Sequence, residues 1–230
     1  MFKKEEFAYF GLSALVLGYI IALSTFTWTG WLIGIGLALA MISIHVIVQK
    51  MVAYKFGANL EYDLWTIRRY WFFEHSHFKK RFPAWLIIPL LLAMMTAGFI
   101  KWFAVLVFEA YPSTKRIEKR WYEMSEWEFA VIAVSGIFAN LILAIVSQLC
   151  GWNDFAILNL LFAFFNALPF SQLDGSKIFF GSRILWVFTI ILISAMLILI
   201  GISNIIATII GALALAIICV LIFYTKYEPH

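Results

Sequence analysis

Three short stretches of the sequence place polar side chains within long apolar runs. His45 and Gln49 are four residues apart, so on a helix they lie on the same face. Asn140 lies in a later run, and Asn166 ends another shortly before Asp174. An imidazole or a carboxylate can bind a metal ion or carry a proton, and an amide can orient either group. Taken alone, each stretch could equally be a buried structural polar group, and none identifies a function by itself.

The composition places these stretches in an integral membrane protein. Apolar residues make up 64% of the 230 residues and charged residues 13%, against about 45–50% and about 25% in soluble domains. The apolar runs do not alternate with polar positions, which favours helices over a β-barrel. Cys150 and Cys219 are too few for a disulfide framework or a thiolate metal cluster. We therefore predict an all-α polytopic protein with one membrane domain over residues 1–230, in contact with the lipid bilayer and not with nucleic acid.

Six apolar runs are predicted to cross the bilayer as helices, and a seventh is doubtful. The six are residues 7–26, 30–49, 129–149, 155–170, 184–202 and 204–224. The doubtful run, 84–107, contains Pro89, Gly98 and Lys101. A lysine near the bilayer centre costs about 2.5–3.5 kcal/mol on insertion scales.

The distribution of basic residues indicates that the run 84–107 does not cross the bilayer. In that case all later basic residues lie on the same side as the N-terminus, as the positive-inside rule requires. These positions are 50–81, 115–120, 177, 183 and 226. We therefore predict about six transmembrane helices plus a re-entrant or interfacial segment near 84–107, with the N-terminus and basic loops on the cytoplasmic side of the cell membrane. In this arrangement His45 and Asp174 lie at the same side and can meet, whereas seven spans would separate them.

Taken together, in this order and spacing, the three stretches resemble the site-2 protease family of intramembrane zinc metalloproteases. Members carry H-E-x-x-H with a basic-aromatic-Gly ending, a central A-G-P-x-x-N helix, and a final N-x-x-P…L-D-G segment. The corresponding segments are His45–Gln49, Ala53–Ala58, Ser135–Asn140, Asn166–Pro169 and Leu173–Gly175. The resemblance covers about residues 30–185, and its final segment is the most specific part.

The resemblance implies a zinc site in which the general base and one metal ligand have been replaced. In the family motif, two histidines and the L-D-G aspartate bind zinc, and the glutamate is the general base. Carried over position by position, His45 is the first metal ligand and Asp174 the third. Val46 stands at the glutamate position and Gln49 at that of the second histidine. Because loss of a general base commonly costs about 10²–10⁴ in rate, we expect no catalytic residue and no cofactor, with zinc bound only if the site still functions.

The resemblance also assigns Asn140, Asn166 and Pro169 to the binding of a substrate segment. The loop 54–82 combines basic and aromatic residues, which suit the headgroup interface. In the resembled family this region forms membrane-associated strands near the active site. We therefore predict a proteolytically inactive, site-2-protease-like protein that binds transmembrane segments of other proteins as a scaffold or regulator.

Two other functions fit parts of the sequence. An active metalloprotease would need an altered ligand set drawn from Gln49, a loop carboxylate, or His75 and His77, although the neighbouring basic residues repel a cation. A small-solute transporter would need polar groups within the membrane, but those present do not form the paired, repeat-related sites of many transporters. These polar residues are Lys101, Asn140, Asn159, Asn166 and Asn204.

Overall fold

A computed structural model of the chain describes residues 3–23, 27–69, 77–113 and 123–227. The helices are α1 (Lys4–Ala22), α2 (Trp28–Lys55), α3 (Ala84–Met95), α5 (Glu126–Leu149), α6 (Asn153–Ala167), α7 (Asp174–Gly181), α8 (Arg183–Leu199) and α9 (Ile205–Tyr227). The strands are β1 (Ala58–Leu64), β2 (Ile67–Arg69), β3 (His77–Phe82) and β4 (Leu106–Pro112). The mostly helical fold is therefore confirmed, and the strands are an addition to it.

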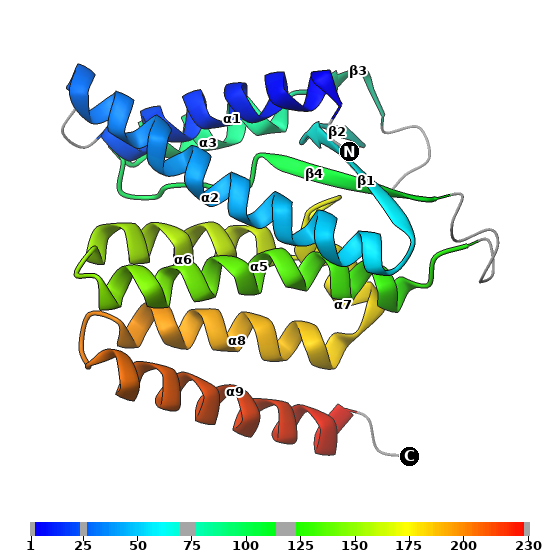
Figure 1. The fold of residues 1–230 in the computed structure, drawn as a ribbon, viewed down its shortest axis with the longest axis vertical. Helices are drawn as coiled ribbons and strands as arrows, with labels where there is room; N and C mark the ends of the chain where they lie inside the picture. Colours follow the sequence, from blue (N-terminus) through cyan, green and yellow to red (C-terminus); the bar gives the residue numbers. More distant parts are fainter. Residues whose placement is uncertain (1–2, 24–26, 70–76, 114–122, 228–230) are drawn as a thin grey trace.

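The long helices lie side by side as successive hairpins, α1 with α2, α5 with α6, and α8 with α9 (Figure 1). Two glycines let the first pair approach closely, because a Cβ on Gly34 would lie 2.7 Å from the carbonyl oxygen of Gly18. Thr27 begins α2 by accepting a hydrogen bond from the Gly30 N–H at 3.0 Å. The first hairpin is thus fixed by small residues and a helix cap.

Among the described residues, four helices are long and apolar enough to cross a membrane, namely α1, α2, α5 and α9. Helices α6 and α8 are also apolar but have only 15 and 17 residues. A span needs about 20 residues, so each would have to include flanking positions. Length and composition therefore support a membrane protein with several candidate spans, while the number six stays a prediction.

The doubtful segment 84–107 does not form one helix. Helix α3 has 12 residues, which rise about 18 Å and cannot cross a hydrocarbon core of about 30 Å. Ala97 and Gly98 then take positive φ angles of 49° and 80°, and the chain returns through an extended stretch into β4 (Figure 1). A continuous seventh helical span is therefore absent from this described segment. Its re-entrant or interfacial placement stays a prediction.

Strands β1 and β4 form an antiparallel ribbon near the end of α2 (Figure 1). The ladder ends in hydrogen bonds from Trp65 N–H to the Val105 carbonyl and from Ser113 N–H to the Gly57 carbonyl, both at 2.9 Å. Hydrogen-bonded and non-bonded positions alternate in such a ribbon. The N–H groups of Phe108 and Ala110 therefore face away from β1. Strands β2 and β3 pair separately.

A buried ion pair joins α1, α2 and β1. The Lys50 Nζ lies 2.7 Å from Oε2 of Glu6, whose side chain is 2% exposed. The Oε1 atom of Glu6 accepts the Tyr62 N–H at 3.0 Å and so occupies the outer edge of β1. A charge this deeply buried needs such partners, because an uncompensated one is strongly unfavourable.

Glu6→Ala is expected to destabilise the protein by roughly 3 kcal/mol, because it leaves Lys50 and the Tyr62 N–H without the carboxylate. The measurement is thermal unfolding of the detergent-purified chain. Glu5→Ala is the matched control, since Glu5 is exposed in the same helix turn and should have little effect. Equal melting temperatures for the two variants would contradict the structural role of the pair.

Candidate functional site

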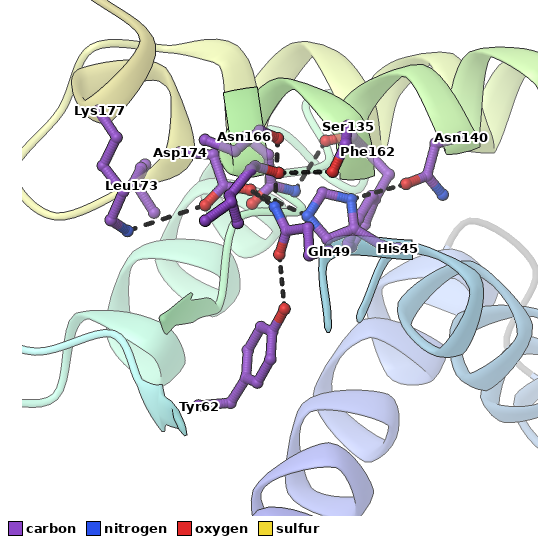
Figure 2. A network of polar contacts seen from close by, with 12 residues as sticks. His45, Gln49, Tyr62, Ser135, Asn140, Phe162, Asn166, Leu173, Asp174 and Lys177 are labelled. Carbon is purple, nitrogen blue, oxygen red and sulfur yellow. Dashed lines mark hydrogen bonds and ion pairs between the residues drawn. The ribbon is translucent and has the colours of Figure 1, made fainter. Parts of the chain in front are cut away.

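The candidate site is a buried polar centre formed by side chains of α2, α5 and α7 (Figure 2). The His45 Nε2 atom lies 2.9 Å from Oδ2 of Asp174. Gln49 donates a hydrogen bond from Nε2 to the same oxygen at 2.8 Å. The structure therefore brings together His45 and Asp174, which the six-span arrangement places on the same side of the membrane. Their assignment as metal ligands stays a prediction.

Asn140 determines which His45 nitrogen donates a hydrogen bond. Nδ1 of His45 lies 2.8 Å from Oδ1 of Asn140. The Asn140 amide nitrogen donates to the Met41 carbonyl at 3.3 Å and to Asn159 Oδ1 at 3.2 Å. Asn159 in turn donates to the Phe155 carbonyl at 2.8 Å. Because a carbonyl oxygen only accepts, both amide orientations are determined and Nδ1 of His45 is the donor.

The contact between His45 and Asp174 therefore holds one proton between Nε2 and Oδ2. An imidazolium with a carboxylate, or a neutral imidazole with a carboxylic acid, both have zero net charge. Gln49 donates to Oδ2 of Asp174, and the Lys177 Nζ lies 3.9 Å from Oδ1. With one shared proton the contact carries no net charge, and its burial costs less than that of a single charge.

Tyr62 of β1 determines how the Gln49 amide is turned. Its hydroxyl donates to Oε1 of Gln49 at 2.6 Å. The amide nitrogen is then left to donate to Asp174 and to the Ala133 carbonyl, the latter at 3.2 Å. Burial raises the pKa of Tyr62 well above its ordinary value, with a smaller effect from Asp174, so the hydroxyl keeps its proton. Gln49 therefore presents N–H groups to the polar centre.

Lys177 of α7 lies at the outer side of the centre (Figure 2). Its Nζ atom is 3.8 Å from the centroid of the Phe108 ring and donates to the Gln172 carbonyl at 2.9 Å. Burial lowers the pKa of Lys177 to about 8, against an opposing effect of Asp174. The contacts with the Phe108 ring and the Gln172 carbonyl direct its ammonium group toward the protein.

Side chains fill the polar centre almost completely. The remaining cavity is about 10 Å³, near the lower limit for one water molecule. Leu106 and Phe108 of β4 line it, and the Phe162 ring contacts His45 edge-on with centroids 5.4 Å apart. On α5, a Cβ added to Gly136 would lie 2.7 Å from Nε2 of His45. Strand β4 and helix α5 thus enclose the centre.

The residues expected to bind a substrate segment lie in different environments. Asn140 belongs to the polar centre. Asn166 is buried beside it and donates to the Phe162 carbonyl at 2.8 Å. Pro169 is exposed in the turn after α6 and is not among the residues that line the centre. Their role in binding stays a prediction.

Of the alternative metal ligands, Gln49 belongs to the polar centre, whereas the described loop carboxylates Glu61 and Asp63 do not. His75 lies outside the described part of the chain, and only the backbone of His77 is described. Glu61 and Asp63 lie on the face of β1 opposite to Tyr62, because side chains alternate along a strand. Neither carboxylate therefore faces His45.

Sequence reasoning missed Tyr62 and Lys177. A signal for Tyr62 was present, because Leu60, Tyr62 and Leu64 alternate with polar residues and so indicate a strand with one buried face. The position of Lys177 over the Phe108 ring depends on a contact between distant segments. We find no signal for it in the sequence.

Gly136→Ala is expected to lower the melting temperature and to alter the NMR shifts of the His45 ring, because the new methyl group would overlap His45 and Gln49. Gly36→Ala is the matched control. Gly36 is also helical but has open space around it, so alanine should be neutral or stabilising by up to about 1 kcal/mol. The same response from both variants would contradict the close approach of α5 to the centre.

Comparisons with known proteins found no relative of this chain. No family model, curated protein or solved structure matches the chain. The polar centre and the surface beside it are therefore the features that indicate a function.

Proposed function

We propose that this chain is a proteolytically silent relative of the site-2 proteases that binds transmembrane segments of other proteins as a scaffold or regulator. One observation carries the proposal. At the family's three ligand positions, His45 and Gln49 are each hydrogen-bonded directly to Asp174. A polar network in which donors and acceptors satisfy each other stabilises the fold without a metal ion.

The donor set does not fit a catalytic zinc ion. Such a site uses three protein ligands and keeps a fourth position for water or substrate. Gln49 presents N–H groups instead of its oxygen, which is engaged by Tyr62 at 2.6 Å. Val46 has an alkyl side chain at the position of the general base and cannot accept a proton. We therefore assign no hydrolytic step to these residues.

The distribution of charge along the helices supports the six-span, multi-pass arrangement of this proposal. The connections between α1 and α2, α5 and α6, and α8 and α9 are nearly free of charge in the sequence, with Asp154 the nearest charged residue. The basic residues gather toward the opposite ends of the same helices. By the positive-inside rule, those opposite ends are cytoplasmic.

A groove beside the polar centre supports the binding of a client chain. Its volume is about 530 Å³, and it lies between β4, the start of α5 and α7. Phe129 and Phe180 contribute apolar walls. Along its β4 side, the N–H groups of Phe108 and Ala110 face away from β1 and have no partner strand among the described residues. Extended segments bind to such strand edges, so a chain that leaves a membrane span can be held here.

The wild-type protein is expected to hold far less than one zinc ion per chain and to leave a single-span peptide intact. The double variant Val46→Glu, Gln49→His should bind zinc toward one per chain, because it supplies a second imidazole beside Asp174. Mass-spectrometric metal counting and a gel-based cleavage assay are the measurements. Gln148→His on α5 is the control for a histidine outside the centre. Stoichiometric zinc with turnover in the wild type would overturn the proposal.

Client binding is tested by photo-cross-linking to a synthetic single-span peptide in nanodiscs. Benzoylphenylalanine in place of Phe180 should cross-link, because Phe180 lines the groove and is 71% exposed. The same group in place of Ile206, which is 67% exposed on α9, is the control and should give little product. Asn166→Ala and Asp174→Ala should weaken the cross-link by loosening the wall behind the groove. Equal yields from the two positions would count against a specific site.

A further inference from the structure

We propose that the groove beside β4 binds a basic segment, the lysine- or arginine-rich flank at the cytoplasmic end of a client's transmembrane helix. The inference rests on the proposed binding of clients and adds the charge of the part that is bound. Three features support it: the shape of the groove, the charges at its surface, and its position on the helix bundle.

The shape of the groove suits an extended segment. It adjoins a second hollow of about 290 Å³, with which it shares Ala110 and Phe129. The two hollows follow the outer edge of β4, whose 7 residues extend over roughly 23 Å at the usual rise per residue. Phe129 and Phe180 offer apolar surface for the methylene stems of lysine or arginine. The groove can thus hold several residues of such a segment.

The carboxylates of the groove face outward, whereas its lysine is engaged within the protein. Glu109 and Glu126 are exposed, and Oε2 of Glu109 also accepts a hydrogen bond from the Tyr111 hydroxyl. The Lys177 side chain is only 16% exposed, and its ammonium group contacts the Phe108 ring and the Gln172 carbonyl. Among the described residues, the exposed charges that line the groove are therefore negative. This local surface departs from the net charge of +4 of the whole chain.

Acidic residues continue beyond the groove on the exposed face of the ribbon. Glu109 pairs in register with Glu61, and two further cavities, of about 350 Å³ and 290 Å³, include Asp63. Of the described residues that line these cavities, Lys3 and Arg81 are basic, and Lys3 is paired with Glu61. Carboxylates therefore outnumber basic side chains in this described lining.

The position of the groove determines which part of a client reaches it. Its lining residues on α5 and α7 lie at the end of the bundle where α5 and α8 begin (Figure 1). That end is cytoplasmic in the proposed arrangement. The positive-inside rule also places lysine and arginine at the cytoplasmic end of a client's own span. A client helix beside the bundle would bring these cations next to Glu109 and Glu126.

The test uses the full chain in nanodiscs and fluorescent single-span peptides that differ only in a Lys-rich, Gln-rich or Glu-rich cytoplasmic flank. The wild type should bind the Lys-flank peptide about three- to tenfold more tightly than the Gln-flank peptide, and less tightly at high salt. The double variant Glu109→Gln, Glu126→Gln should lose this preference while binding the Gln-flank peptide unchanged. Asp154→Asn, a carboxylate removed at the opposite end of the bundle, should keep it.

Charge reversal is the second arm of the test. Glu109→Lys should bind the Glu-flank peptide more tightly than the Lys-flank peptide, and that binding also establishes that the variant is folded. Equal affinity of the wild type for the Lys and Gln flanks, or an unchanged preference in the double variant, would overturn the inference and leave client binding intact. If the wild type binds none of the peptides, client binding itself fails.

Discussion

The hydrogen-bonded contact between His45 and Asp174 is the constraint on which the arrangement of this protein depends. It joins α2 to α7 across a long interval of sequence, at 2.9 Å between Nε2 and Oδ2. A polar contact so deeply buried is stable only if its remaining donors and acceptors are also satisfied. Gln49, Tyr62 and Asn140 supply those bonds. The positions of β1, α2 and α5 are therefore fixed by polar geometry as well as by apolar packing.

Close backbone approach makes this geometry possible. Gly136 lets α5 lie against His45, and a Cβ on Gly175 would overlap the Ala167 carbonyl at the junction of α6 and α7. These glycines have a packing role, since neither has a positive φ angle. The same residues explain why the centre is nearly closed, at about 10 Å³. A site with bulky residues at these positions would have to separate its helices and admit solvent.

The helical segments could be anticipated from the sequence, because long apolar runs are visible in it directly. The proximity of His45 and Asp174 could also be anticipated, because the distribution of basic residues places both on the same side of the membrane. The roles of Tyr62, Glu6 and Lys177 could not. Each depends on the register of β1 against β4 or on a contact between helices distant in the chain. The segment 84–107 was only partly predictable. Lys101 and Pro89 argue against a helical span, but they do not predict that the chain returns in an extended conformation into β4.

The carboxylate of Glu6 has a consequence for self-association. It accepts the Tyr62 N–H on the outer edge of β1 at 3.0 Å, whereas the outer edge of β4 has no partner strand among the described residues. Two copies joined through their β4 edges would form a closed twofold pair, and neither would have another edge of this ribbon to offer. Further growth of the ribbon from such a pair would require displacing Glu6 from the Tyr62 N–H.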